Sequence, residues 1–461
     1  MTHRWLASWR RGRAWATRAQ LRVEHLEART LLTSSLVVVP SPNVTGAILL
    51  GAAAIAHNDI WAVGYYDTLN PQNQIVFQTV AEHFDGTSWS VIPTPSSQNG
   101  GELLSVAGVA TGDVWAVCAQ FATFGYASSL IEHWNGSSWS VVASGSLPSA
   151  HFTGVTAISS NDVYAVGGDA GNNALVEHWN GSSWSQVSSS AFNNVGSLSA
   201  VSADASNDVW AVGCCGPIGT GQAILHWNGT SWSLVSSHPR FGPLAIAALS
   251  PSNVWVAGTV EDSDNDSQIA AVEHWDGTSW SIVPSPNPNP GLDKNSHLLG
   301  VAAISASDIW AVGDIGAPFG HIATLTEHWD GASWSIIASP NPGTTSNRLY
   351  GVTALGDGTV AAVGHQSGSA SDSGLVLRNA SSAPGTASPA APLAASATTA
   401  SSTPVAHTTT MPARFVAAPV EQFFAALAKE NQSLSSANST SRAHRAAASG
   451  GLDALLGDIW L

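Results

Sequence analysis

The sequence has few basic residues. Its 461 residues include 15 Lys and Arg against 31 Asp and Glu, which gives a formal net charge of −16. The imbalance is concentrated in residues 34–380, where 25 acidic side chains stand against Arg240, Lys294, Arg348 and Arg378. Nucleic acids and anionic lipid surfaces are bound through clustered Lys and Arg, so this acidic segment argues against both as partners.

Cysteine is also scarce, and long apolar runs are missing. Cys118, Cys214 and Cys215 are an odd number with one adjacent pair, which is not a disulfide framework. Free or buried thiols fit this pattern, and a Cys214–Cys215 bridge is the alternative, so cysteine usage neither supports nor excludes export. No run of 18 apolar residues occurs, and we therefore expect no membrane-spanning helix.

Tryptophan, in contrast, is abundant, with 20 residues, and most of it lies in a repeated phrase. Asn-Gly or Asp-Gly between two β-rich runs is a strong hairpin signal, because both residues tolerate positive φ. Each copy of the phrase therefore predicts two strands joined by a tight turn. The phrase reads EHWDGTSWSIVPSP at 273–286 and recurs with small changes at 82–95, 132–144, 177–189, 225–237 and 327–340.

A second phrase, DIWAVG at 59–64, recurs at intervals of 45 to 55 residues, a period typical of propellers and similar arrays. One further β-rich run precedes each copy, as in LLGVAAIS at 298–305. The two phrases and this run give four strands per repeat. Four antiparallel strands repeated around an axis predict an all-β fold, a β-propeller.

The last repeat is incomplete. Residues 349–382 give three strands but lack the SWS strand, whereas LVVVPSPN at 36–43 resembles the fourth strand of the fifth repeat, WSIVPSPN at 280–287. We expect 36–43 to supply the missing strand, which would close a ring of seven blades and remove two sheet edges. The predicted segments are a basic leader at 1–33, the propeller at 34–382, an Ala/Ser/Thr/Pro linker at 383–417 and a tail with short amphipathic helices at 418–461.

The phrases resemble the repeat of kelch-type propellers. In that family a double glycine ends the second strand, and an aromatic–Asp pair precedes a turn and a Trp. The counterparts here are Gly313, Trp329-Asp330 and Trp334, and only the third repeat has the double glycine. The resemblance implies the propeller fold.

A second resemblance lies near the N-terminus. VEHLEARTLL at 23–32 is similar to a short LE-x-R-x-LL motif found at the start of large secreted or surface proteins of certain bacteria. The resemblance implies a bacterial protein that is secreted or displayed at the cell surface.

Residues copied into every repeat are interpreted as structural, because a ligand role would require six equivalent sites. Large rings repeated in each blade suit packing between blades. The repeated His and Glu alternate along one strand, so their side chains face opposite sides of the sheet. Because neighbouring blades cover both sides, both side chains need hydrogen-bond partners. The Trp residues assigned to this structural repeat are Trp61, Trp89, Trp115, Trp139, Trp184, Trp210, Trp232, Trp255, Trp280, Trp310 and Trp334.

Function is expected where the repeats differ, in the loops between second and third strands and between successive blades. In a propeller these loops share one face. Exposed aromatic rings with a few polar groups suit sugar or protein contacts. The candidate ligand-binding residues on this face are Tyr65, Tyr66, Phe121, Phe124, Tyr126, His151, His238, Arg240, Phe241, His297, Phe319, His321, Arg348 and His365.

One loop has the spacing of a calcium site. Asp262, Asp264 and Asp266 alternate as calcium ligands do, and Glu273 falls at the twelfth position. However, Ser267 stands where such loops carry Gly, and Glu273 belongs to the repeat. A solvated acidic loop is therefore the interpretation we prefer to calcium, and no other cofactor is expected.

The sequence thus predicts a monomeric, exported or cell-surface, non-catalytic binding or scaffold module with a glycan or protein ligand. The alternative is a glycan-active enzyme of glycosidase or oxidase type at the central opening of the same face. A sialidase-like site needs three Arg. The propeller has only Arg240, Arg348 and Arg378, and Arg378 is expected on a strand at a position that is Trp in other repeats, which argues against such a site. An enzyme predicts that acids and bases from different blades converge at the axis, whereas a binding module predicts aromatic rings without such a cluster.

Overall fold

The structure is a computed structural model, and all residues that it describes belong to one compact unit, Ser35–Leu461. Within helices and strands, nothing is described of the side chains of 121, 126–128, 214–215, 262, 267 and 317. The described ranges are 35–42, 44–70, 73–95, 100–121, 126–145, 149–215, 222–235, 240–262, 267–286, 295–317, 321–355, 357–368 and 372–379.

The described residues form strands in a recurring order of four, with one short 3₁₀ helix, η1 (Ser190–Phe192). The first strands are β2 (Ala47–Ala56), β6 (Glu102–Ala110), β10 (His151–Ser159), β14 (Val195–Ala205), β18 (Phe241–Ser250), β22 (Ser296–Ser305) and β26 (Ser346–Ala354). The second strands are β3 (Asp59–Leu69), β7 (Asp113–Phe121), β11 (Asp162–Gly168), β15 (Asp208–Cys215), β19 (Asn253–Asp262), β23 (Asp308–Ala317) and β27 (Val360–Ser367).

The outer strands are shorter. The third strands are β4 (Ile75–Phe84), β8 (Tyr126–Trp134), β12 (Ala174–Trp179), β16 (Ala223–Trp227), β20 (Ser267–Trp275), β24 (His321–Trp329) and β28 (Ser373–Asn379). The fourth strands are β5 (Trp89–Ile92), β9 (Trp139–Val142), β13 (Trp184–Gln186), β17 (Trp232–Val235), β21 (Trp280–Val283) and β25 (Trp334–Ile336), and β1 (Leu36–Val38) lies beside β28.

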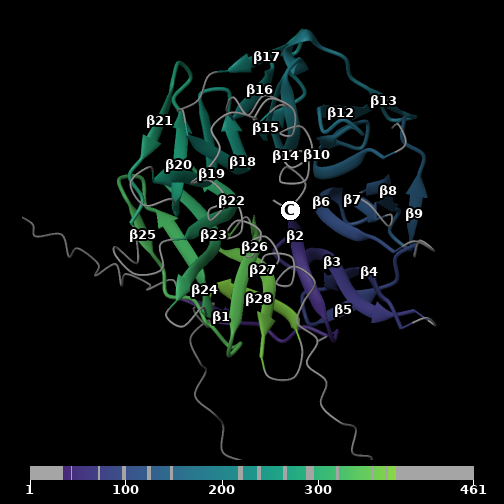
Figure 1. Cartoon of the computed structure of the whole chain (residues 1–461), viewed down its shortest axis with the longest axis vertical. Helices are drawn as coiled ribbons and strands as arrows, with labels where there is room; N and C mark the ends of the chain where they lie inside the picture. Colours follow the sequence, from purple (N-terminus) through teal and green to yellow (C-terminus); the bar gives the residue numbers. More distant parts are fainter. Residues whose placement is uncertain are drawn as a thin grey trace, which may run out of the picture. The chain divides into compact units, whose positions relative to one another are not determined.

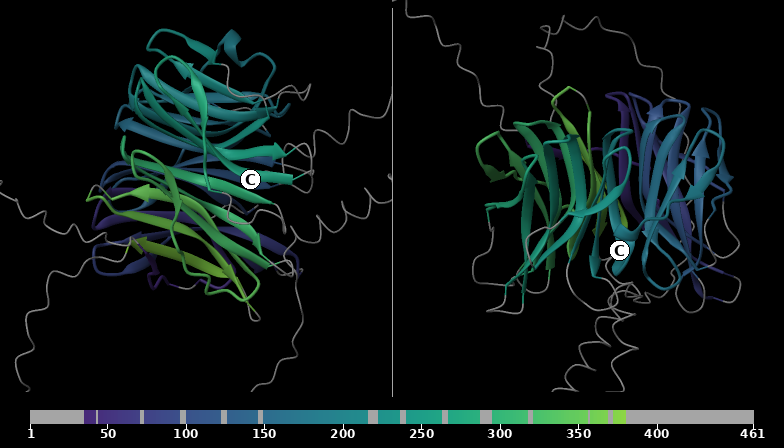
Figure 2. Two further views of the ribbon diagram at one scale, coloured as in Figure 1. Left: turned by 90° about the vertical axis from the view of Figure 1, so that its left-hand side faces the viewer. Right: turned by 90° about the horizontal axis from the view of Figure 1, so that it is seen from above.

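These strands build five four-stranded antiparallel sheets and one eight-stranded sheet. The eight-stranded sheet consists of two such groups, joined by a single parallel pair between Ile322 of β24 and Ser346 of β26. The first strands surround the centre of the view in Figure 1, and the labelled fourth strands lie at its periphery. The sheets stand side by side in Figure 2. The predicted all-β class and the four strands per repeat are confirmed.

The last repeat takes its outermost strand from the start of the chain. β1 pairs antiparallel with β28, with Leu36 opposite Asn379. Arg378 is paired with Ala361, as each repeated His is paired with the aromatic residue of the second strand. The expectation that Arg378 takes a Trp position is therefore wrong by one residue. Its guanidinium lies 5.0 Å from the centre of the Phe84 ring in the first repeat.

The hairpins between third and fourth strands form as predicted, but their turns are longer than expected. Phe84 pairs with Trp89, so the loop has four residues, and of these Gly86 has a positive φ of 93°. Asp85 Oδ1 accepts hydrogen bonds from the backbone N–H groups of Thr87 and Ser88. The Asp or Asn of the phrase is thus selected because its side chain caps the turn, not because it tolerates positive φ.

The repeated Trp residues pack one sheet against the next, as predicted. Trp61 of β3 lies 5.1 Å from Trp134 and 5.2 Å from Trp139, both in the following repeat. The contact recurs from Trp115 to Trp179 and Trp184. By buried area, each such ring contributes roughly 4 kcal/mol or more.

The repeated His has a hydrogen-bond partner that the sequence did not reveal. His133 Nε2 lies 2.8 Å from Asp113 Oδ1, which also accepts a 3.0 Å hydrogen bond from Trp115 Nε1, and the imidazole stacks on the Trp115 ring. Asn253 replaces the Asp in the fifth repeat and makes the same two contacts. The first residue of the DIWAVG phrase therefore orients both rings.

The repeated Glu is fully buried, and the expectation that each has a hydrogen-bond partner holds only in part. Glu177 accepts a 3.2 Å hydrogen bond from Gly145 N–H and Glu327 a 2.5 Å bond from the Ser285 hydroxyl. Neither carboxyl oxygen of Glu82 or of Glu132 is bonded to a described residue. Burial raises the pKa of Glu132 to about 8 and that of Glu82 to about 7.

Candidate functional site

Each first strand carries a one-residue bulge at the same position. In β2, the pairing with β3 skips from Leu49 to Gly51, so Leu50 has no partner on the second strand. Bulges commonly redirect side chains next to functional sites. The bulge residues are Leu50, Leu104, Thr153, Ser199, Leu244, Leu299 and Tyr350. These residues therefore lie on the first strands, which surround the centre of the view in Figure 1.

The recurring glycine of the DIWAVG phrase is explained by this bulge. A Cβ at Gly64 would lie 1.9 Å from the carbonyl oxygen of Ile48, and one at Gly364 would lie 1.8 Å from that of Arg348. In these repeats the lack of a Cβ lets the second strand approach the bulge so closely. In the second repeat Cys118 takes this place; it is buried and its thiol is free.

Each bulge residue follows a paired residue, as Leu50 follows Leu49 in β2. The residue before this pair varies strongly between repeats. We call these the pre-bulge residues. They include hydrophobic, acidic and basic side chains, so repeats that agree in their cores differ at this level. The pre-bulge residues are Ile48, Glu102, His151, Ser197, Gly242, His297 and Arg348.

Polar residues of the sixth and seventh repeats converge at this level. His297 Nδ1 lies 2.9 Å from Asp314 Oδ1, and Arg348 Nε lies 3.5 Å from Asp314 Oδ2. Asp314 is 4% exposed, whereas the Arg348 side chain is 32% exposed. A buried carboxylate thus bridges two basic side chains, of which Arg348 remains open to solvent.

A tyrosine and a second histidine complete this group. The Tyr350 ring stacks on the His365 ring, with 5.7 Å between centroids and an interplanar angle of 20°. His365 Nε2 lies 3.4 Å from Ser346 Oγ, while its buried Nδ1 has no partner among the described residues. We call His297, Asp314, Arg348, Tyr350 and His365 the axial cluster.

The electrostatics of the axial cluster follow from burial. Burial lowers the pKa of His365 to about 4, so its imidazole is neutral at pH 7. Burial also raises the pKa of Tyr350, although a hydrogen bond and the charge of Arg348 oppose this shift. The cluster therefore presents one cation, a phenol and a neutral imidazole, with Asp314 paired behind them.

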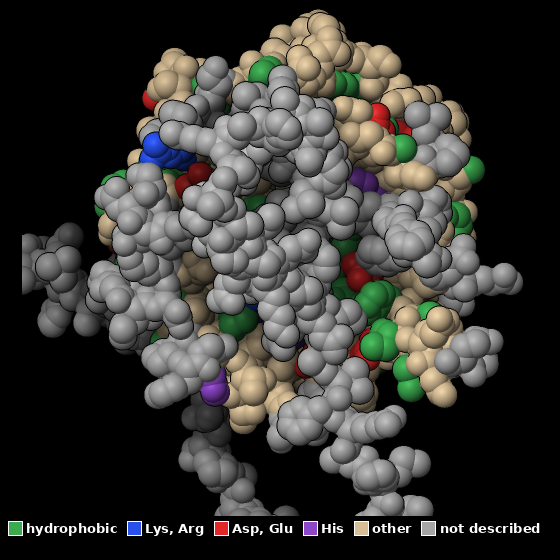
Figure 3. All heavy atoms as spheres, viewed as in Figure 1, with side chains coloured by type: hydrophobic (Ala, Val, Ile, Leu, Met, Phe, Trp, Pro, Cys, Tyr) green, Lys and Arg blue, Asp and Glu red, His purple; other side chains and the backbone are tan. Residues whose placement is uncertain are grey.

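Tyr65 of the first repeat lies within electrostatic range of Tyr350, and Glu102 of the second repeat lies within range of Tyr65. Burial raises the pKa of Glu102 to about 8. Burial and the carboxyl of Glu102 together raise the pKa of Tyr65. Tyr65 also packs its ring edge-on against Phe77, 5.1 Å away. Acidic side chains are visible at several places in the face shown in Figure 3, and basic ones at few.

Of the predicted ligand-binding residues, the structure therefore brings together His297, Arg348 and His365, with Tyr65 in electrostatic range. The other candidates whose side chains are described do not join this group. Tyr66 packs against the core between the first and last repeats, and Phe241 is fully buried. Phe241 was expected in a loop, but it is the first residue of β18 and its ring fills the space between sheets.

His151 is also buried rather than loop-exposed. Its Nε2 lies 3.0 Å from Ser197 Oγ, the pre-bulge residue of the next repeat, and burial lowers its pKa to about 4. Arg240 is exposed at a positive φ of 76°, and His321 is exposed at the start of β24. Phe124, His238 and Phe319 lie outside the described residues, as do the side chains of Phe121 and Tyr126.

The predicted calcium loop is outside the described part of the chain at Asp264 and Asp266, and the side chain of Asp262 is not described. Among the residues that the structure describes, no group of three His, Cys, Asp or Glu is placed to hold a metal ion. Within the same residues, no helix is long and apolar enough to cross a membrane.

Sequence reasoning missed Asp314 and Tyr350. Asp314 directly follows the glycine of DIWAVG, where other repeats have Tyr65 or His365. Tyr350 stands at a position that is Leu in four repeats. Departure from a repeated residue beside the recurring glycine is the signal that could have found both.

The fold is that of a β-propeller. No family model matches the chain, and no curated protein matches it either. Among solved structures, the chain is similar to YCF48 bound to a D1 peptide, with a TM-score of 0.50 and 15% identity over 75% of this chain and 96% of that one. YCF48 from Cyanidioschyzon merolae gives a TM-score of 0.48 and 14% identity over 75% and 98% of the two chains. At this identity the likeness concerns the fold alone.

Proposed function

We propose that this chain is a non-catalytic binding module that holds a glycan or protein ligand at the axial cluster, on the face of the variable loops. The observation that carries the proposal is the convergence of Arg348, Tyr350 and His365, at positions where the other repeats have mostly apolar or small residues. The YCF48 structure with a peptide is a case of a propeller with a bound ligand.

The physical support is that the group is held in advance of binding. Asp314 fixes both His297 and Arg348, and Tyr350 is stacked on His365. Side chains that are already ordered lose little conformational entropy when a ligand arrives. Arg348 offers hydrogen-bond donors and Tyr350 an aromatic ring, the pairing that dominates many binding hot spots.

We further propose that residues 34–382 form a closed ring of seven blades, with 36–43 as the last strand of the last blade. Three contacts between the last and first repeats support closure. Ala54 N–H donates to Thr353 Oγ1 at 3.0 Å, Arg378 donates to the His57 carbonyl at 3.3 Å, and His57 Nδ1 lies 2.6 Å from Asp357 Oδ2.

The remaining assignments are proposals of the same kind. We assign 1–33 as an export leader of a secreted or cell-surface bacterial protein, 383–417 as a linker and 418–461 as a tail. The kelch-like character of the repeat and a monomeric state belong to the same proposal, as does binding without a cofactor. Fractionation of the native host tests the leader, since a chain confined to the cell interior would contradict it.

A second candidate function is a glycan-active enzyme at the same place. It is favoured by one observation, that acids and bases from different repeats do converge: the His297–Asp314 pair lies beside Arg348 and Tyr350. A histidine oriented by a carboxylate is a common general base. Release of sugar fragments from a polysaccharide that the protein binds, abolished in H297A, would establish this candidate instead.

The binding proposal is tested with two substitutions that have precedents in other repeats of the chain. Y350L introduces the residue found at the bulge of four other repeats, and R348S introduces the pre-bulge residue of the fourth repeat. Both should fold. Wild type, both variants and the control R240A are applied as full-length protein to a printed array of polysaccharides and peptides.

We expect wild type and R240A to bind the same probe and both axial variants to bind about tenfold more weakly, or about 1.4 kcal/mol. Wild-type binding that survives in Y350L and R348S would place the ligand elsewhere. Absence of binding to every probe would contradict the proposed function.

A further inference from the structure

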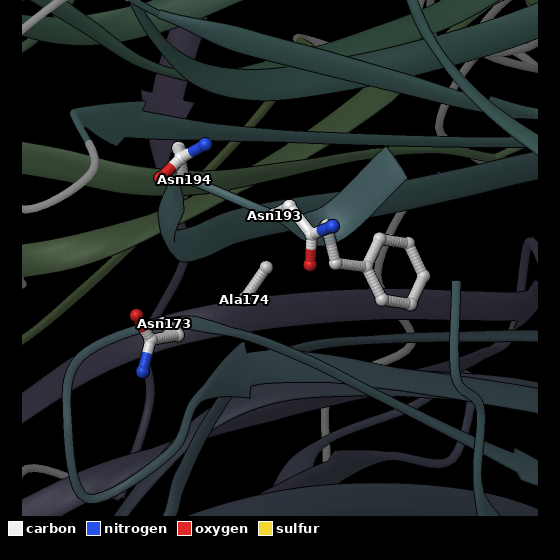
Figure 4. A pocket seen from close by; sticks show the side chains of 5 residues that line it. Asn173, Ala174, Asn193 and Asn194 are labelled. Atoms are coloured by element: carbon white, nitrogen blue, oxygen red, sulfur yellow. The ribbon is translucent and has the colours of Figure 1, made fainter. Parts of the chain in front are cut away.

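A small cavity lies at a separate place, where the third repeat meets the fourth. It has a volume of about 470 Å³ and is lined by Asn173, Ala174, Phe192, Asn193 and Asn194 (Figure 4). Asn173 belongs to the connection between β11 and β12, and the last three residues lead from η1 into β14. The cavity is thus built from both kinds of variable loop. Its volume is within the range of roughly 300–1,000 Å³ typical of small-molecule sites.

One wall of the cavity is fixed by Asp169. Its Oδ1 accepts hydrogen bonds from Gly171 N–H at 2.8 Å, Asn173 N–H at 2.9 Å and Asn173 Nδ2 at 3.0 Å. The amide nitrogen of Asn173 is therefore used within the loop, which leaves its side-chain oxygen as an acceptor. In Figure 4 this oxygen points to the side of the cavity where Asn193 and Asn194 lie.

The opposite wall is fixed by the short helix. Ser189 Oγ accepts a hydrogen bond from Ala191 N–H at 3.2 Å, and the Phe192 ring packs edge-on against Trp232, 5.7 Å away. An isolated bridge between Asn173 and Gly196 joins the two walls. Both walls are thus held by contacts that do not involve a ligand.

The side-chain amides of Asn193 and Asn194 are exposed and make no hydrogen bond to described residues. Each offers two N–H donors and one carbonyl acceptor. Together with the Asn173 oxygen they form a set of neutral donors and acceptors around the Ala174 methyl group. None of the five lining residues is charged, so nothing in the lining favours an ion.

We propose that this cavity binds a neutral, polyhydroxylated ring, the chemistry of a pyranose sugar. Adjacent hydroxyl groups donate and accept at once, which an amide matches with its N–H and C=O groups, and the C–H face of the ring fits against Ala174 and Phe192. The inference rests on the proposed binding function and assigns a sugar-binding subsite that is separate from the axial cluster.

The experiment is saturation-transfer NMR on the full-length protein with the methyl pyranosides of glucose, galactose, mannose and N-acetylglucosamine. We expect transfer to at least one of them, and an affinity about tenfold weaker in the double variant N193A/N194A. The matched control is N207A, an exposed Asn in the turn between β14 and β15.

Each other outcome overturns the inference. Transfer to none of the four glycosides, or equal affinity in wild type and N193A/N194A, would show that the cavity is not a sugar site. Transfer that is lost in R348S but kept in N193A/N194A would move the sugar to the axial cluster, which contradicts this subsite and supports the proposed function.

Discussion

At the residue scale, the Asp, Trp and His of the second, fourth and sixth repeats act as one hydrogen-bonded unit. In the second repeat, Asp113 Oδ1 receives both His133 and Trp115. The fifth repeat makes the same contacts with Asn253, so a carbonyl oxygen suffices. The unit occurs on several sheets, which supports its structural interpretation.

Two substitutions at Asp113 test this interpretation. D113N keeps the accepting oxygen, and we expect it to change the free energy of unfolding by less than about 1 kcal/mol. D113A leaves both ring N–H groups without their partner, and we expect a loss of about 1–3 kcal/mol. Urea denaturation followed by tryptophan fluorescence measures both. Equal losses would show that the carboxylate charge matters rather than its hydrogen bonds.

The axial cluster shows which residues could be predicted at this scale. His297, Arg348 and His365 were recognised because they break the repeat, although they lie in β22, β26 and β27 and not in the expected loops. Asp314 and Tyr350 were missed, although each departs from the residue that other repeats have at its position. Phe241 and His151 were wrongly expected in loops, since their strands begin earlier than the apolar pattern suggests.

At the element scale, the repeats predicted strand number and pairing well, because hydrophobic patterning and turn residues are local signals. The bulges were not predicted. LLG in the first repeat and LYG in the last are compatible with a regular strand, and the bulge becomes apparent only when the second strand approaches the carbonyl of Ile48 or Arg348. Tertiary packing decides this geometry.

The N-terminal strand offers a second test within one element. Leu36 is 3% exposed and packs with Trp310 and Leu377, whereas Val38 is 44% exposed on the same strand. We expect L36A to lower the free energy of unfolding by about 2–4 kcal/mol and V38A by less than about 1 kcal/mol. Thermal denaturation compares them. If both variants melt together with wild type, β1 contributes nothing to the stability of the last repeat.

At the scale of the whole molecule, the buried carboxyls predict how stability depends on pH. Burial raises the pKa of Glu132 to about 8, from 4.5 for an exposed Glu. Between these values the unfolded chain releases a proton that the folded chain keeps, so stability falls as pH rises. Glu82, Glu177 and Glu327 act in the same direction, each with a pKa of about 7.

The substitution E132L removes the contribution of Glu132 to this pH dependence of stability. It has a precedent in Leu225, which occupies the same position in the fourth repeat. We expect E132L to be more stable than wild type by about 1–3 kcal/mol at pH 8, and the difference to shrink toward pH 4. Denaturation curves across this range, with the exposed Glu261 changed to Gln as control, decide it. Parallel profiles for E132L and wild type would refute the prediction.

The candidate site is a property of the whole molecule, and this limits what sequence can reveal. The axial cluster and its acidic neighbours come from the sixth, seventh, first and second repeats, so Tyr65 and His365 are 300 positions apart in the chain. Only the arrangement of the sheets around an axis brings them to one level. The repeat pattern does not predict which side chains meet there.

The pairing of β1 with β28 has a mechanical consequence. Leu36 and Asn379 face each other at the same end of the two strands, so the chain enters and leaves the described sheets at adjacent points. A force that pulls on both flanks would load this pair as a zipper, opening its backbone hydrogen bonds one after another rather than shearing them together. Stretching the protein by its two ends should therefore detach β1 from β28 at low force before any other strand pair separates.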